Sequence, residues 1–247
     1  MSAPGLDVEA VARTIGLLCQ RVEQRFPGSG LSGVARELDR VAQQTRERAA
    51  WIAHPILGLR IAVGALIALI AAGLAGTVVS LRTPKESVEI FQFVQVLESG
   101  INDLVLVGAG VFFLLTLETR LKRRRALAAI RELRAIAHII DMHQLTKDPE
   151  WVLQRGDERD RETGVLPPQR MTRFELSRYL DYCSEMLSIT GKIAALYIQN
   201  FDDDGALAAV NEVENLTTGL SRKIWQKLMI LYAMGPEASV PAETQTR

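Results

Sequence analysis

The residues best suited to chemistry lie in one predicted helix, within RAIAHIIDMH (134–143). Arg134, His138 and Asp141 are spaced by four and three residues, which places them on one helix face. A histidine oriented by a carboxylate can act as a base, sense pH near neutrality or bind a metal. His143 is five residues from His138, whereas paired metal ligands on a helix are spaced by about four. Arg134, His138 and Asp141 are therefore a candidate functional polar face, for which a structural ion-pair network is the favoured role.

The acidic turn NFDDDG (200–205) is similar to the start of a calcium loop. Its twelfth position is Asn211, and the carboxylate of Glu212 comes one residue late. An acidic helix start is the favoured interpretation.

The two cysteines, Cys19 and Cys183, are far apart and form no metal-binding pattern. No phosphate-binding loop or nucleophile–base pattern is present, so we expect no catalytic residue, no cofactor and no metal.

Two apolar stretches predict an all-α integral membrane protein. The first span is predicted at about 56–81, because 21 uncharged residues separate Arg60 from Arg82. At about 1.5 Å per residue, this length crosses a hydrocarbon core of about 30 Å. Small residues recur in it every fourth position: Gly64, Ala68, Ala72, Gly76 and Ser80. We expect this helix-packing lane to pack against the second span, against a copy of itself, or both.

The second span is predicted at about 96–118. Only the 14 residues of Leu104–Leu117 are free of charge, so the span must extend toward Val94. Three polar residues interrupt this extension: Glu98, Asn102 and Asp103. They are candidate intramembrane polar residues, with solvation in the outer interface as the simpler alternative. A basic cluster ends the span and predicts an inside anchor: Arg120, Lys122, Arg123, Arg124 and Arg125.

The distribution of positive charge predicts the topology. The outside loop, 82–95, carries few basic residues, whereas the sequence before the first span and after the second is rich in arginine. Basic residues accumulate on the side that is not translocated. We therefore expect a multi-pass protein of the bacterial inner membrane with both termini in the cytoplasm. Lysine plus arginine and aspartate plus glutamate both total 29, so no basic excess indicates nucleic-acid binding.

The remaining segments predict a helical cytoplasmic module around a transmembrane hairpin at 55–118. An N-terminal helical hairpin is expected at 1–54, where Leu31, Val34, Leu38 and Val41 have coiled-coil-like spacing. The second span is expected to continue as an unbroken helix through 119–148, because this stretch lacks glycine and proline. A charged linker (149–171), a C-terminal helical hairpin (172–234) and a disordered tail (235–247) complete the chain. Thr172 and Glu175 form a predicted capping box at the start of that hairpin.

Two of the cytoplasmic segments, RAIAHIIDMHQLTKDPEW (134–151) and VNEVENLTTGLSRKIWQKLM (210–229), carry a family resemblance. They resemble a family of bacterial two-span membrane proteins that has no assigned activity. The resemblance implies the membrane architecture described above, and it supplies no catalytic residues.

The functional expectation is a non-enzymatic homo-oligomeric scaffold, or a relay from the membrane to a cytoplasmic protein partner. Its partners would be the lipid bilayer and further copies of the chain. The alternative is an oligomeric ion channel or transport component with Glu98, Asn102 and Asp103 at its outer mouth. A more remote alternative is a membrane-bound hydrolase that uses His138 and Asp141.

Overall fold

A computed structural model describes residues 5–81, 90–147, 149 and 171–233. Within these ranges every regular element is an α-helix, which confirms the predicted all-α fold. The predicted tail (235–247) and nearly all of the predicted linker (149–171) lie outside the described residues. Helix α4 (Ile90–Leu145) begins within the segment predicted as the outside loop, and residues 82–89 lie outside the described residues.

The contacts divide the chain into two units. We call residues 1–49 and 127–247 the bundle, and residues 50–126 the hairpin. Two helices contribute residues to both units: α2 (Gly30–Ala53) and α4 (Ile90–Leu145). Helix α4 runs unbroken through the whole basic cluster and ends at Leu145, four residues before Pro149.

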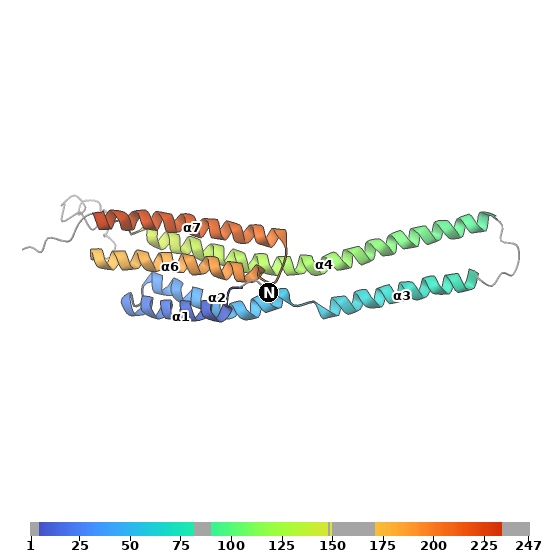
Figure 1. The fold of residues 1–247 in the computed structure, drawn as a ribbon, viewed down its shortest axis with the longest axis horizontal. Helices are drawn as coiled ribbons and strands as arrows, with labels where there is room; N and C mark the ends of the chain where they lie inside the picture. The colour runs from blue at the N-terminus through green and yellow to red at the C-terminus, as the bar shows by residue number, and fades with distance from the viewer. Residues whose placement is uncertain (1–4, 82–89, 148, 150–170, 234–247) are drawn as a thin grey trace, which may run out of the picture. The chain divides into compact units, whose positions relative to one another are not determined.

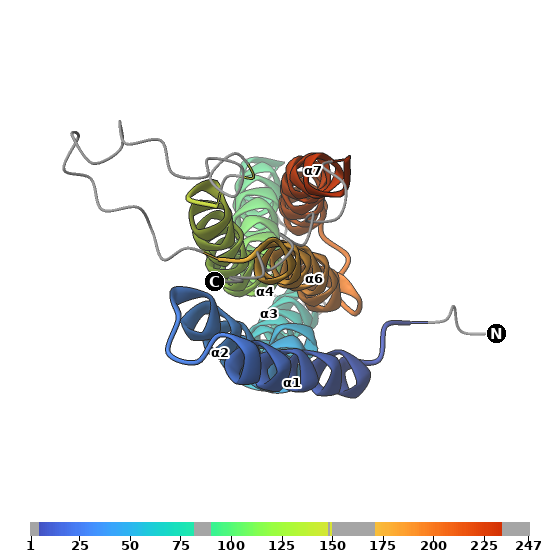
Figure 2. The ribbon, with the colours of Figure 1, turned by 90° about the vertical axis from the view of Figure 1, so that its left-hand side faces the viewer.

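The bundle contains α1 (Val8–Arg25), α6 (Arg173–Ile198), α7 (Asp204–Ala233) and the bundle parts of α2 and α4 (Figure 1). Helices α6 and α7 pack along each other as an αα-hairpin, and α1 packs on α6. In Figure 2, α6 lies between α1 and α2 on one side and α4 and α7 on the other. It is the central helix of the bundle.

Side-chain caps fix three of the bundle's helix starts. Asp7 accepts a hydrogen bond from the Glu9 amide at the start of α1. Thr172 and Glu175 form the predicted capping box of α6. At α7, Asp203 accepts from the Ala206 amide at 2.9 Å, so the helix includes the end of the predicted acidic turn. Each cap satisfies amides that the first helical turn leaves without an intrahelical partner.

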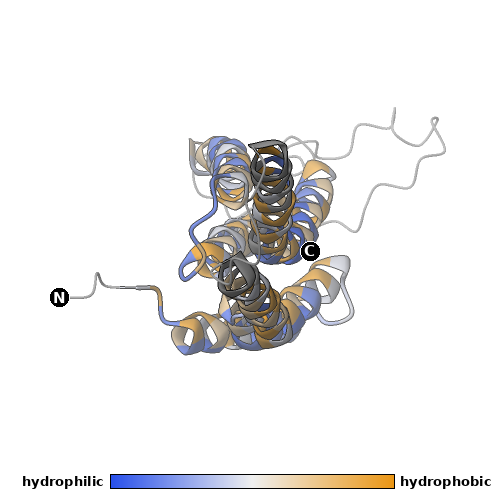
Figure 3. Ribbon diagram, turned by 90° about the vertical axis from the view of Figure 1, so that its right-hand side faces the viewer, coloured by the Kyte–Doolittle hydropathy of each residue, from blue (hydrophilic) through white to orange (hydrophobic). Residues whose placement is uncertain are grey.

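The core of the bundle is built from apolar helical stripes, of which the stripe in α2 was predicted. Buried residues follow a helical period in α1 (Val11, Ile15, Leu18, Val22), α2 (Leu31, Val34, Leu38, Val41) and α7 (Val210, Val213, Leu220, Ile224, Leu231). Helix α6 is buried around most of its circumference, which is expected of a helix surrounded by others. Hydrophilic residues, blue in Figure 3, are interspersed with the apolar ones along the bundle helices.

The hairpin contains α3 (Leu57–Leu81) and α4 up to Ala126. The chain leaves α3 at Leu81 and returns in α4 from Ile90, so the two helices run in opposite directions. Two helices of the structure are long and apolar enough to cross a membrane by length and composition. Their large apolar side chains are exposed, with 70% exposure at Leu69 and 75% at Leu106.

Candidate functional site

The predicted polar face of α4 does not form a mutual network among the described residues. Arg134 instead pairs with Glu212 of α7 at 3.1 Å, where both side chains are more than half exposed. Asp141 accepts a hydrogen bond from Gln144 at 2.6 Å, within the same helix. His138 is exposed. Within the described residues, no group of three histidine, cysteine, aspartate or glutamate side chains could hold a metal ion.

The C-terminal end of α4 is held by a lysine from α7. Lys227 Nζ donates to the carbonyl oxygens of Gln144 at 2.7 Å and Lys147 at 3.1 Å. These carbonyls lie at the negative end of the helix dipole, so an ammonium group stabilises them by charge as well as by hydrogen bonding. The contact joins α4 to the C-terminal half of α7.

A buried thiol and a buried phenol lie on α6 near this helix end. Burial raises the pKa of Cys183 and of Tyr179 above their usual ranges. Lys147 Nζ lies 5.3 Å from the Tyr179 ring centroid, and burial lowers the pKa of Lys147. A protonated, fully buried thiol is a poor nucleophile, so this arrangement is suited to packing and not to covalent catalysis.

The most connected polar group of the hairpin is Glu118. Its carboxylate accepts from Arg60 at 3.1 Å and from Lys122 at 3.0 Å. It also accepts from the Ile56 backbone amide at 3.4 Å, just before α3 begins. The Glu118 and Lys122 side chains are only 15% and 12% exposed. We call Arg60, Glu118 and Lys122 the base clasp, since they join the start of α3 to α4.

Two members of the predicted inside anchor reinforce this junction. Lys122 Nζ donates to the Ala53 carbonyl at 3.2 Å, and Arg125 donates to the Trp51 carbonyl at 3.4 Å. The Arg125 guanidinium also lies 3.6 Å from the centroid of the Trp51 ring, a cation–π contact. The residues of the basic cluster therefore point to two different sides of α4. Lys122 and Arg125 contact the end of α2, whereas Arg120, Arg123 and Arg124 are exposed.

The predicted helix-packing lane lies on an open side of α3. Gly64, Ala68, Ala72 and Gly76 are exposed, and a Cβ atom added at either glycine would meet no heavy atom within 4 Å. The more covered residues of α3 follow a different helical stripe: Leu59, Val63, Leu66 and Ile70. The lane is thus not the side of α3 that the hairpin covers. The side chain of Ser80 lies outside the described residues.

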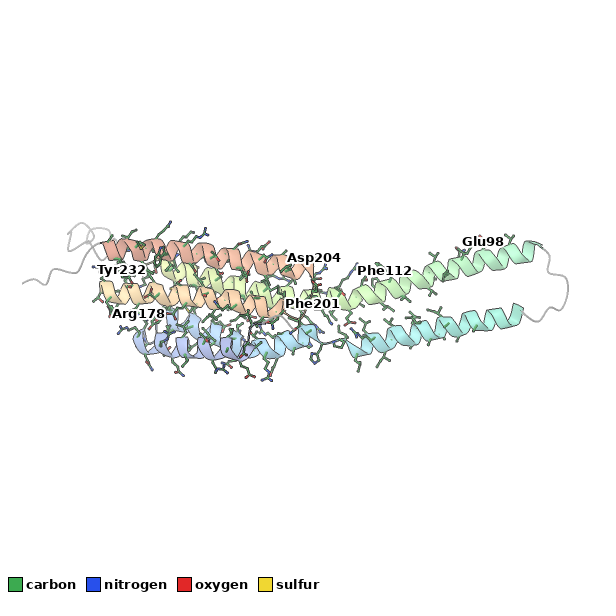
Figure 4. The ribbon with its side chains drawn as sticks, in the orientation of Figure 1. Glu98, Phe112, Arg178, Phe201, Asp204 and Tyr232 are labelled. Carbon is green, nitrogen blue, oxygen red and sulfur yellow. The ribbon has the colours of Figure 1, made fainter. Side chains whose placement is uncertain are left out.

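The three candidate intramembrane polar residues lie near the start of α4. Glu98 and Asn102 are exposed and four residues apart, so they share a face of the helix. Figure 4 labels Glu98 on this part of α4. The side chain of Asp103 lies outside the described residues.

Sequence reasoning missed the base clasp. A glutamate at the end of an apolar run, four residues before a lysine, is a local signal that could have identified Glu118 and Lys122. Their partner Arg60 could not have been found in this way, because it is 58 residues distant in sequence. Comparison with protein families, with curated proteins and with solved structures gives no match for this chain.

Proposed function

We propose that the chain is a non-enzymatic integral membrane protein, a homo-oligomeric scaffold or a relay from the membrane to a cytoplasmic partner. In this proposal α3 and about 96–118 of α4 cross the bacterial inner membrane, and both termini are cytoplasmic. One observation carries it: the hairpin leaves long apolar helices exposed, with Leu69, Leu106 and Phe112 each at least 69% exposed. Such a surface is stable in lipid or against another protein, and not in water.

The relay part of the proposal rests on α4. This helix is continuous from Ile90 to Leu145 and supplies residues to both the hairpin and the bundle. A rigid helix can carry a small displacement, because its backbone hydrogen bonds resist bending along its length. The base clasp holds α4 at Glu118, and Lys227 holds its C-terminal end. In this proposal the contacts of the base clasp and of Lys227 would move together with α4.

The scaffold part of the proposal rests on the open helix-packing lane. Lipid gives apolar helices little reason to associate, so close approach over small residues is a main route to association. The double substitution Ala68→Leu/Ala72→Leu should dissociate the oligomer in detergent. Ala62→Leu, rotated by about 160° from Gly64 and about 120° from Ala68 on the helix, is the matched control and should leave the oligomer intact. An unchanged size for the double variant would remove the lane from the proposal.

The second candidate function is an oligomeric channel or transport component. The exposed, shared face of Glu98 and Asn102 favours it, since ionisable groups near a membrane often mark an ion path. Reconstitution of the purified protein into liposomes separates the two proposals. A channel predicts ion flux whose selectivity changes with Glu98→Gln, whereas the scaffold and relay predict no flux in either protein.

A further inference from the structure

One face of α4 changes from apolar to basic at the end of the proposed second span. Leu106, Phe113 and Arg120 are spaced by seven residues, nearly two full helical turns, so they lie in one line. Ala109 and Arg124 fall on the same face. All five are exposed, with 75% exposure at Leu106 and 54% at Phe113.

The opposite face of α4 is the one that the hairpin uses. The complementary stripe consists of less exposed residues, namely Val107, Val111, Leu114, Glu118 and Lys122. Gly110, Thr116 and Leu117 are also half-buried. The Glu118 carboxylate is turned to Arg60, Lys122 and the Ile56 amide. The nearest acid on the helix therefore pairs on the other side and does not lie beside Arg120 and Arg124.

From this arrangement we infer that the outward face of α4 binds one anionic phospholipid, with its phosphate between Arg120 and Arg124 and an acyl chain along Phe113 and Leu106. The inference rests on the proposed membrane insertion. Arginine donates several hydrogen bonds in a planar fork and pairs well with phosphate oxygens. Basic residues directly beyond a span attract anionic headgroups. The apolar residues on the same line supply the surface that an acyl chain needs.

A specific lipid site differs from general attraction between basic residues and an anionic membrane surface, because only certain arginines take part in it. The basic residues that contact the backbone, Lys122 and Arg125, have their donors directed to the Ala53 and Trp51 carbonyls. The site therefore requires the two arginines on the apolar line. It also requires an acyl chain, so a free phosphate ion would bind it more weakly than a lipid.

Native mass spectrometry of the full chain tests the inference. Purified protein in detergent would be mixed with phosphatidylglycerol or with phosphatidylcholine of the same acyl chains. We expect the wild-type protein to retain phosphatidylglycerol preferentially, and Arg120→Gln/Arg124→Gln to bind it roughly 30-fold more weakly. Arg120→Lys/Arg124→Lys keeps the charge but loses the planar fork, so it should restore only part of the affinity. Phe113→Ala should weaken binding of the lipid without changing the affinity of the site for inorganic phosphate.

Arg13→Gln/Arg36→Gln is the matched control, because both arginines are exposed on the bundle. It should bind phosphatidylglycerol as the wild type does. Equal retention of both lipids by the wild type, or unchanged retention by Arg120→Gln/Arg124→Gln, would overturn the inference. Failure of the membrane proposal itself has a different signature: the protein would then be released from membranes by an alkaline wash.

Discussion

The bundle and the hairpin use the same apolar residue types in opposite ways. In the bundle, leucines such as Leu180 and Leu133 are fully buried, whereas polar side chains share the outside with scattered apolar ones such as Leu17. In the hairpin, Leu69 and Leu106 are mostly exposed and few charges accompany them. An amphipathic helix buries its stripe against other helices, whereas a helix that is apolar all round requires an apolar environment. The two units therefore differ in how far they bury their apolar side chains.

A matched pair of leucine truncations gives the largest expected contrast. Leu180→Ala should destabilise the bundle by about 2–5 kcal/mol, because it removes buried contacts and leaves a cavity in α6. Leu69→Ala, at a site 70% exposed, should leave the thermal unfolding of the bundle unchanged. The measurement is thermal unfolding by circular dichroism in detergent. Equal losses in both variants would mean that the units do not differ as described.

The base clasp tests whether the hairpin also depends on a polar contact. Glu118→Gln removes the charge paired with Arg60 and Lys122, at an expected cost of about 1–3 kcal/mol locally. The Ile56 amide should then exchange with deuterium faster, since it donates to Glu118. The control Glu9→Gln loses only an exposed pair with Arg46 and should not alter exchange at Ile56. Unchanged exchange in Glu118→Gln would show that the clasp does not fix the start of α3.

The buried thiol of the bundle predicts a loss of stability at alkaline pH. Burial raises the pKa of Cys183, so the unfolded chain releases this proton at a lower pH than the folded chain does. Stability from this group is complete below about pH 8.5 and falls as the pH rises further. Cys183→Ala should therefore reduce the drop in melting temperature between about pH 8 and pH 10. A drop as steep as that of the wild type would assign it to other groups, such as Tyr179, whose pKa is also raised.

The smallest expected effect is that of the predicted polar face. Arg134→Ala removes an ion pair in which both side chains are exposed. The free energy of unfolding should therefore fall by no more than about 1 kcal/mol. His138→Ala should have a comparably small effect on stability. Chemical denaturation of both variants checks this expectation. A loss of several kcal/mol would show that this face has a structural role beyond the pair with Glu212.

Local patterns in the sequence were sufficient to predict the helices. The Thr172–Glu175 capping box and the buried stripe of α2 depend on residues three or four apart, and both are observed. The same reasoning predicted the unbroken course of α4 from the absence of glycine and proline.

The partners between distant segments could not be predicted in this way. Glu132 of α4 pairs with Arg40 and Arg48 of α2, and Lys227 of α7 holds the end of α4. These contacts join residues about 80 or more positions apart, and helical periodicity contains no information on which stripe meets which. The central position of α6 was missed for the same reason, because it follows from the packing of all the other helices around it.

The central claim is that the hairpin lies in lipid while the bundle lies in water, and cysteine labelling in nanodiscs tests it most directly. Single cysteines would replace Ala72, Leu106 and the exposed bundle residue Leu17, with Cys19 changed to Ser and Cys183 to Ala. Both membrane faces are accessible in a nanodisc, so a water-soluble maleimide reaches every aqueous site. We expect fast labelling at position 17, and we expect positions 72 and 106 to be protected until the sample is denatured. Labelling at 72 and 106 as fast as at 17 would contradict it.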